Sequence, residues 1–184
     1  MPRLLRTIAL AGALAGCVAP NAATVATPMA APVTTVILVR HAEKEAEPAA
    51  DPALTAAGRS RADALAEMVK HAGVDAIVST RFQRTRLTAA PVAALLGLTV
   101  EIIEPRAPTH ARDVADAILA RHRGGTVLVV GDSNTVPAIV AALGAALPPP
   151  ICDAQYDNVY VVTIRPERKA TLVRARYGAA SGSC

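Results

Sequence analysis

Aromatic residues are scarce in this chain of 184 residues, which has no Trp, one Phe and three Tyr. Surfaces that bind nucleic acid usually combine a strong positive field with aromatic side chains on which bases stack. The formal net charge is only +4, and two of the basic residues, Arg3 and Arg6, stand at the extreme N-terminus. The composition therefore predicts that the protein has no nucleic-acid partner.

The glycine-rich motifs that cradle nucleotides are also missing, since the chain contains neither a Walker loop nor a G-x-G-x-x-G sequence. The few histidines, cysteines and acidic residues show none of the ligand spacings that are typical of zinc sites. We therefore predict no metal ion and no cofactor.

No apolar run near the N-terminus is long enough to cross a bilayer, for which a helix needs about 20 residues. Residues 1–6 are basic, residues 7–15 are apolar, and Leu14-Ala15-Gly16-Cys17 follows directly. This arrangement resembles a bacterial lipoprotein signal, in which residues 1–16 are removed and Cys17 carries the acyl chains. The alternative is an ordinary secretory signal with an incidental cysteine. Both interpretations place the protein outside the cytoplasm, and the first anchors it to a membrane of the cell envelope, facing the periplasm or the exterior.

Residues 17–33 are almost wholly Ala, Pro, Thr and Val without periodicity, which is typical of a tether. The domain would then comprise residues 34–184. Its two cysteines, Cys152 and Cys184, would lie in an oxidising compartment, where a pair more often forms a disulfide than a metal or redox site. Two independent buried thiols are the alternative.

Strand-like and helix-like segments alternate through the domain, which predicts an α/β fold. Apolar runs predict strands at 34–39, 76–79, 98–103 and 126–130, and helical spacing predicts helices at 55–71, 84–96, 112–121 and 135–143. Near the C-terminus, 158–164 and 171–176 flank Arg165-Pro166-Glu167-Arg168 and predict an antiparallel hairpin at one edge of the sheet. We therefore expect a three-layer α/β/α sandwich with a mostly parallel sheet.

Polar clusters follow three of the predicted strands and open the first helix. They are Arg40-His41-Ala42-Glu43-Lys44, Leu54-Thr55-Ala56-Ala57-Gly58-Arg59, Ser79-Thr80-Arg81-Phe82-Gln83-Arg84-Thr85 and Gly131-Asp132-Ser133-Asn134-Thr135. In an open parallel sheet, ligands bind beyond the carboxyl ends of the strands. Together and in this order, the clusters resemble the histidine phosphatase superfamily, which has the phosphoglycerate-mutase-like fold, and in particular its small bacterial single-domain branch.

The resemblance implies a phosphomonoesterase that acts without a metal ion on a small phosphorylated substrate. It makes His41 the nucleophile that becomes transiently phosphorylated, and it assigns Arg40, Arg84, Ser133 and Asn134 to phosphate binding. The chemistry of the side chains agrees independently, because arginine forks fit the equatorial oxygens of a transferring phosphoryl group.

Asp132 departs from the pattern of the family, in which a second pocket histidine stands at this position. An ionised Asp132 would repel a phosphate dianion and impair activity, by about ten- to a hundredfold if the repulsion amounts to ~1–3 kcal/mol. A protonated Asp132 could instead donate to phosphate or act as a general acid. The sequence leaves both possibilities open.

Glu43 is the best placed candidate for the general acid, with an exposed carboxylate paired with Lys44 as the alternative. Glu45, Glu47 and Asp51 are expected in a solvated loop. Of the remaining histidines, His71 and His122 are expected at helix ends and His110 in a loop, all three with structural or exposed positions.

Two other functions fit parts of the sequence. A degenerate, phosphatase-like lipoprotein could bind a phosphorylated ligand or an envelope partner without turnover. Gly131-Asp132-Ser133 also resembles the GDS block of serine esterases, but no histidine follows Ser133 in this chain. The esterase interpretation would therefore need an unfamiliar order of catalytic residues.

Overall fold

The computed structural model describes residues 32–166 and 168–184. The predicted signal peptide, Cys17 and nearly all of the predicted tether lie outside the described residues, so these assignments stay predictions. Within the described residues, no helix is both long and apolar enough to cross a membrane.

Six strands form one mixed sheet in the order β3-β2-β4-β1-β5-β6. They are β1 Thr34–Arg40, β2 Ala76–Ser79, β3 Val100–Ile102, β4 Thr126–Gly131, β5 Asn158–Arg165 and β6 Arg168–Arg176. β1, β2, β3 and β4 pair in parallel, and β5 and β6 form the antiparallel hairpin at one edge. The predicted α/β sandwich, its mostly parallel sheet and its C-terminal hairpin are confirmed.

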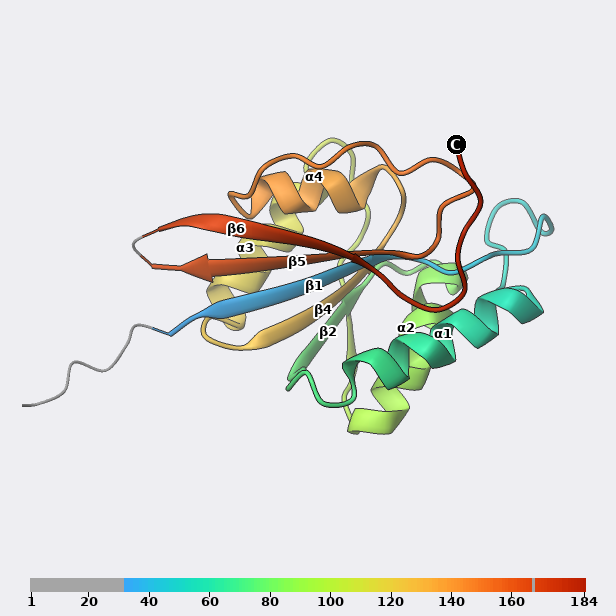
Figure 1. The fold of residues 1–184 in the computed structure, drawn as a ribbon, viewed down its shortest axis with the longest axis horizontal. Helices are drawn as coiled ribbons and strands as arrows, with labels where there is room; N and C mark the ends of the chain where they lie inside the picture. Colours follow the sequence, from blue (N-terminus) through green and yellow to red (C-terminus); the bar gives the residue numbers. More distant parts are fainter. Residues whose placement is uncertain (1–31, 167) are drawn as a thin grey trace, which may run out of the picture. The chain divides into compact units, whose positions relative to one another are not determined.

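Helices cover both faces of the sheet, as Figure 1 shows. On one face lie α1 and α2, and on the other lie α3 and α4. Their bounds are α1 Ala56–Val69, α2 Gln83–Leu96, α3 His110–Arg121 and α4 Thr135–Ala142. The predicted bounds agree within one or two residues at nearly every end, but α3 begins at His110, which was expected in a loop.

The central strands are apolar on both faces because helices cover both of them. Leu38 and Val129 point into the core beneath α3 and α4, whereas Val39 and Val130 point into the core beneath α1 and α2. This two-sided burial explains the near-continuous apolar runs of β1 and β4, which are typical of a parallel sheet. It also fixes the place of the polar residues that follow the strands.

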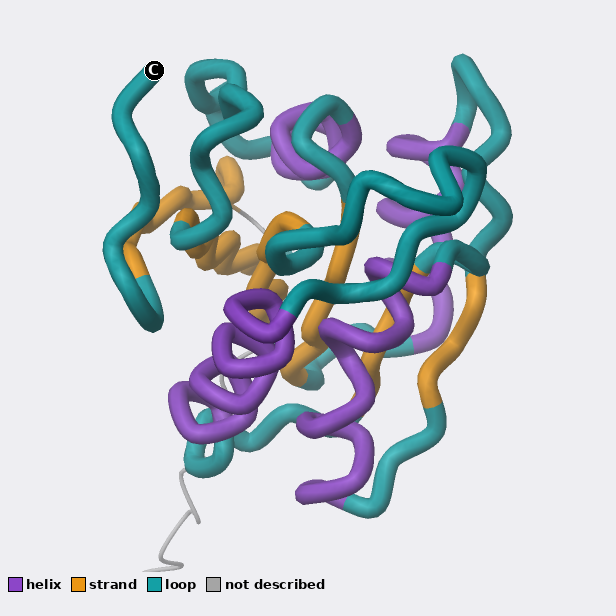
Figure 2. Tube along the Cα trace, turned by 90° about the vertical axis from the view of Figure 1, so that its right-hand side faces the viewer, coloured by secondary structure: helices purple, strands orange, loops and turns teal. Residues whose placement is uncertain are grey.

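The carboxyl ends of β1, β2 and β4 meet at one edge of the sheet, because these strands run in parallel. Figure 2 looks onto this edge, where many of the connecting loops gather. The three polar clusters that follow strands in the sequence therefore come together here.

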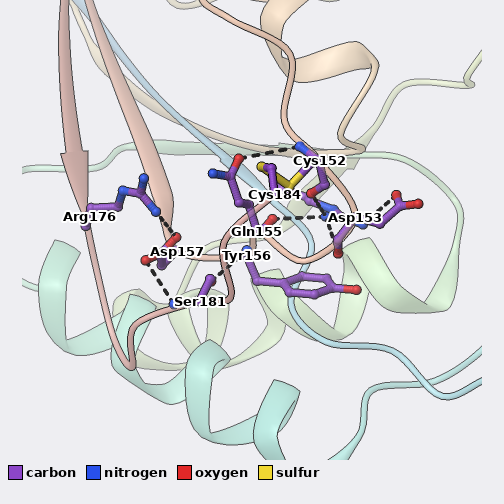
Figure 3. Close-up of a disulfide and its surroundings, with 9 residues drawn as sticks. Cys152, Asp153, Gln155, Tyr156, Asp157, Arg176, Ser181 and Cys184 are labelled. Atoms are coloured by element: carbon purple, nitrogen blue, oxygen red, sulfur yellow. Dashed lines mark hydrogen bonds and ion pairs between the residues drawn. A yellow bond between two sulfur atoms is a disulfide. The ribbon is translucent and has the colours of Figure 1, made fainter.

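The C-terminal tail, residues 177–184, turns back from β6 toward the segment that precedes β5. Cys184 forms a disulfide with Cys152, with a Cα–Cα separation of 6.0 Å, and Figure 3 shows its surroundings. The predicted pair is therefore present in the structure.

Candidate active site

A cavity of about 690 Å³ opens at the carboxyl edge of the parallel strands. Its lining includes six of the seven predicted pocket residues, which are Arg40, His41, Arg84, Asp132, Ser133 and Asn134. The seventh, Glu43, is not among the residues that line it.

His41 follows β1 and is held at the level of the sheet, since its backbone N–H donates to the Gly131 carbonyl at 2.8 Å. Its ring Nδ1 lies 2.8 Å from the Ala42 carbonyl oxygen. A carbonyl can only accept, so Nδ1 carries the proton and Nε2 keeps a free lone pair. This partner, which the sequence did not identify, gives His41 the tautomer that a nucleophile needs.

Burial lowers the pKa of His41 to about 4, against smaller opposing effects of the Ala42 carbonyl and Asp132, and Arg40 and Arg84 lower it further. The imidazole is only 3% exposed and lies close to both guanidinium groups. At neutral pH the ring is therefore uncharged and able to attack.

Two neighbouring helices fix the loop that follows His41. Thr88 in α2 accepts from the Ala42 backbone N–H at 2.9 Å, while its own hydroxyl donates to the Arg84 carbonyl at 2.7 Å. Thr55 caps α1 by accepting from the Gly58 N–H at 3.0 Å, and its backbone N–H donates to the Glu43 carbonyl. A side chain at Gly58 would collide with that carbonyl, so the glycine allows α1 to approach the loop.

Arg40 is buried, and its guanidinium is bound by backbone carbonyls. Nη1 donates to the carbonyl oxygens of Cys152, Asp153 and Gln155 at 2.9, 3.1 and 2.9 Å. The guanidinium carbon also lies 4.2 Å from the centre of the Tyr156 ring. These partners are neutral, and the ion pair with Asp153 is long, 3.9 Å from Nη2 to Oδ1 of a fully exposed side chain, so most of the positive charge of Arg40 is left for an anion in the cavity.

Arg84 is bound by a carboxylate instead. Its Nε and Nη2 lie 2.9 and 2.8 Å from Asp132 Oδ1, which is also 3.7 Å from His41 Nε2. The expected repulsion between Asp132 and phosphate assumed a carboxylate without a partner, and the structure supplies one. An incoming phosphate must therefore compete with Asp132 for Arg84.

Asp132 is itself positioned by the turn into α4. Its backbone N–H donates to Thr135 Oγ1 at 2.9 Å, and its carbonyl accepts from the Val136 N–H. Ser133 and Asn134 complete the turn at the rim of the cavity. No hydrogen bond among the described residues joins Ser133 to a histidine, so the geometry gives the serine-esterase alternative no support.

The expectation that Glu43 faces the pocket is wrong. Its carboxylate accepts from Nε and Nη2 of Arg61, a buried residue of α1, at 2.7–3.0 Å. Burial raises the pKa of Glu43, but the hydrogen bonds and charge of Arg61 outweigh it and hold the pKa below its usual range. The alternative of an exposed pair with Lys44 is also wrong, because the partner is a buried arginine.

His110, for which a structural or exposed position in a loop was expected, is buried as the first residue of α3 and lines the cavity. Its Nδ1 lies 3.2 Å from the Glu104 carbonyl. Phe82 also lines the cavity, and the guanidinium carbon of Arg84 lies 4.3 Å from the centre of its ring. Asp51, expected to be merely solvated, accepts from the Gln83 N–H at the start of α2.

Three-residue clusters of metal-binding side chains are absent from residues 32–166 and 168–184. The cationic side chains that line the cavity are Arg40, Arg84 and Lys44. Their arrangement around a neutral histidine suits the binding of an anion.

Residues 36–105 match the family described as the histidine phosphatase superfamily, branch 1. The match contains β1, α1, β2 and α2, and with them Arg40, His41 and Arg84. No curated protein matches the chain in sequence.

Solved structures with the histidine phosphatase fold resemble the domain over most of its length. The protein histidine phosphatase SixA, complexed with tungstate, has a TM-score of 0.63 and 19% identity, over 77% of this chain and 96% of that one. A mycobacterial glucosyl-3-phosphoglycerate phosphatase with inorganic phosphate has a TM-score of 0.58 and 17% identity, over 79% and 97%. A phosphoserine phosphatase from Entamoeba histolytica has a TM-score of 0.55 and 15% identity, over 80% and 98%. At these identities the likeness shows the fold.

Proposed function

We propose that the protein is a phosphomonoesterase that works without a metal ion and forms a phosphohistidine on His41. The observation that carries this proposal is the buried, neutral His41, whose proton is held on Nδ1 and whose Nε2 faces the cavity beside Arg84 and Asp132. Arg40 and Arg84 supply the charge that would stabilise the equatorial oxygens of the phosphoryl group.

The reaction would proceed in two displacements. In the first, Nε2 attacks phosphorus, a P–N bond forms, and the bond to the ester oxygen breaks. In the second, water attacks the phosphohistidine, the P–N bond breaks, and phosphate leaves with the histidine neutral again. The leaving oxygen gains one proton, and the attacking water loses one.

Asp132 is the acidic residue best placed to carry that proton. Of the two acidic residues that line the cavity, Asp153 is fully exposed, whereas Asp132 lies beside the nucleophile. When a phosphate replaces Asp132 on Arg84, the freed carboxyl lies beside the anion, in position to act as the general acid.

The deciding experiment measures the hydrolysis of p-nitrophenyl phosphate between pH 4 and 8 by the purified protein. We expect turnover that a chelator leaves unchanged, and none in a His41→Ala variant. Acid quenching with radiolabelled substrate should trap a phosphohistidine in the wild type alone. Turnover by His41→Ala at the wild-type rate would remove His41 from the chemistry.

A second function is favoured by the Arg84–Asp132 pair, which places a carboxylate oxygen 3.7 Å from His41 Nε2. If the pair does not open, the domain would bind a phosphorylated ligand or an envelope partner without hydrolysing it. Calorimetric binding of inorganic phosphate or tungstate, together with no turnover at any pH, would support this function over the first.

We also propose that the protein is lipid-anchored through Cys17 in the bacterial cell envelope. The support is the signal-like N-terminus and the disulfide between Cys152 and Cys184, since such bonds persist in oxidising compartments. Cys17→Ser should move the protein from the membrane fraction to the soluble fraction. A variant that still sediments with membranes like the wild type would refute the anchor.

A further inference from the structure

The C-terminal tail, residues 177–184, is bound at its start by α1. Arg61 Nη1 donates to the carbonyl oxygens of Tyr177 and Ala179 at 3.1 and 2.9 Å. The same guanidinium holds Glu43, two residues after the nucleophile. The tail and the loop that follows His41 therefore share one buried arginine.

The middle of the tail is bound by the start of the hairpin. Ser181 Oγ accepts from the Tyr156 backbone N–H at 2.8 Å, and the Ser181 N–H donates to Asp157 Oδ2 at 3.1 Å. Arg176 donates to the other oxygen of Asp157 at 2.6 Å. Figure 3 shows Asp157 between Arg176 and Ser181, with Tyr156 beside them.

The end of the tail is bound covalently, because Cys184 is joined to Cys152. Residues 152–156, which we call the arginine-binding loop, supply every carbonyl that accepts from Arg40 Nη1 as well as the Tyr156 ring against its guanidinium. The tail is thus attached to both ends of the loop that holds Arg40, by Cys184 at residue 152 and by Ser181 at residue 156.

The arginine-binding loop has little packing of its own. Asp153 and Ala154 are exposed, and Pro149 and Pro150 just before the loop are exposed as well. Three carbonyl oxygens can converge on one nitrogen only if the backbone holds a defined curve, and fixing each loop residue that is free to move costs conformational entropy. Within the loop, the Gln155 N–H donates to the Cys152 carbonyl at 3.0 Å, and the contacts with the tail restrain both ends of the curve.

We propose that the tail, residues 177–184, is a positioning element that orients Arg40 for phosphate by holding the arginine-binding loop. This inference rests on the proposed function, because it assumes that Arg40 binds the phosphoryl group. Cys184 and Ser181 are then positioning residues, which act on the substrate through Arg40 and do not touch it.

The test compares the full chain with its Cys184→Ser variant, using inorganic phosphate as a competitive inhibitor of p-nitrophenyl phosphate hydrolysis. A misplaced Arg40 binds phosphate less well, so the inhibition constant for phosphate and the KM should each rise about tenfold, as loss of ~1.4 kcal/mol of binding would produce. A purely structural role would reduce only the fraction of folded enzyme, which lowers the apparent kcat and leaves both constants unchanged.

Thr34→Val is the matched control. Thr34 accepts from the Gly124 N–H at 2.8 Å near the amino end of β1, at the opposite edge of the sheet from the cavity. This variant loses a native contact, as Cys184→Ser does, but the inhibition constant for phosphate should stay at the wild-type value. Should Cys184→Ser fail to fold, Ser181→Ala removes only the side-chain contact with Tyr156 and should raise both constants in the same direction by a smaller factor.

Unchanged phosphate inhibition in the folded variant, whether Cys184→Ser or Ser181→Ala, would overturn the positioning role. A wild type that neither hydrolyses the substrate nor binds phosphate in calorimetry would overturn the proposed function instead. The two failures are therefore distinguishable.

Discussion

Arg40 and Arg84 line the same cavity, but their guanidinium groups are held by partners of different charge. Three neutral backbone carbonyls hold Arg40 Nη1, and a negatively charged side chain holds Arg84. The fully exposed Asp153, 3.9 Å from Nη2, opposes this charge only weakly, so Arg40 presents most of its positive charge in every state of the site. Arg84 presents its charge to an anion only when the Asp132 carboxylate leaves its guanidinium.

This difference separates two tasks that a phosphate site must perform. A guanidinium fixed by carbonyls costs no rearrangement when the anion arrives, which is the electrostatic preorganisation on which catalysis depends. A guanidinium bound by a carboxylate must exchange one anion for another, so the bound carboxylate offsets part of its attraction for phosphate. We therefore expect Arg40 to contribute most of the affinity for phosphate, and Arg84 with Asp132 to control the state of the site.

The largest effect is expected for Arg40→Ala, which should lower kcat/KM for p-nitrophenyl phosphate about a thousandfold, or ~4 kcal/mol. The variant loses the charge and leaves three carbonyls without their donor, so its unfolding free energy should fall as well. Arg84→Ala should lose less, about a hundredfold. Steady-state kinetics at equal folded concentration measure both variants, and a greater loss in Arg84→Ala would reverse the comparison.

The next effect concerns stability at acid pH, because the pKa of His41 is lowered to about 4 in the folded protein. Unfolding returns the imidazole to its usual pKa near 6.5, so the unfolded chain binds the proton first as pH falls. Stability is unaffected above about pH 6.5 and is lost progressively between 6.5 and 4, by about 3 kcal/mol in total.

Urea denaturation at pH 7, 5.5 and 4 measures this loss against His41→Gln, whose side chain does not titrate. Across this window, His41→Gln should lose less stability than the wild type, and the difference should equal the contribution of His41 titration. The carboxylates of Glu43 and Asp157, whose pKa values are lowered, lose their contribution at more acidic pH. If the stability of the two proteins falls equally as the pH is lowered, burial does not keep His41 neutral.

The coupling between Arg84 and Asp132 should be worth about 1–3 kcal/mol in a double-mutant cycle on kcat/KM. Arg84→Ala alone leaves the Asp132 carboxylate unpaired and facing phosphate, so part of its loss is repulsion. Adding Asp132→Asn removes that repulsion and should restore the hydrolysis of p-nitrophenyl phosphate, whose leaving group departs without a proton, by about ten- to a hundredfold. Additive effects of the two substitutions would mean that the pair does not control the site.

The sequence could predict the residues whose place is set by the ends of strands and helices. Arg40, His41, Arg84 and Asp132 directly follow apolar strands or open a helix, and parallel strands bring such residues to one edge of the sheet. The fold was predictable for a related reason, since strands buried on both faces and helices with one apolar face leave periodic patterns in the chain.

Partners that lie far away in the chain left no such pattern. Glu43 was assigned to the pocket because nothing near it shows that Arg61, 18 residues later, would bind it. The carbonyls that hold Arg40 come from residues more than 110 positions away, and a carbonyl has no residue signature. His110 was expected in a loop because the helical pattern was recognised only from Arg112, whereas the structure places His110 at the start of α3 and at the cavity.

The smallest expected effect, and the one that decides the role of residue 132, is that of Asp132→His. The substitution removes the carboxylate that occupies Arg84 and puts an imidazole, the group at this position in the family pattern, beside the phosphate. We expect kcat/KM for phosphate monoesters to rise about tenfold at neutral pH, the gain of ~1.4 kcal/mol that a released cation and a neutral donor can supply.

The pH profile separates the two ways in which Asp132 can act. A wild type that needs Asp132 protonated should be most active at acid pH and lose activity as that carboxyl ionises, while Asp132→His should stay active toward neutrality. Asp132→Asn is the matched control, because it frees Arg84 without supplying a group that titrates: its activity should rise if the carboxylate only competes with phosphate, and fall if Asp132 carries the proton to the leaving oxygen. If the wild type is efficient at neutral pH and both substitutions lower its activity, then the carboxylate is an adapted part of the catalytic site, and the competition between Asp132 and phosphate for Arg84 is not what limits the enzyme.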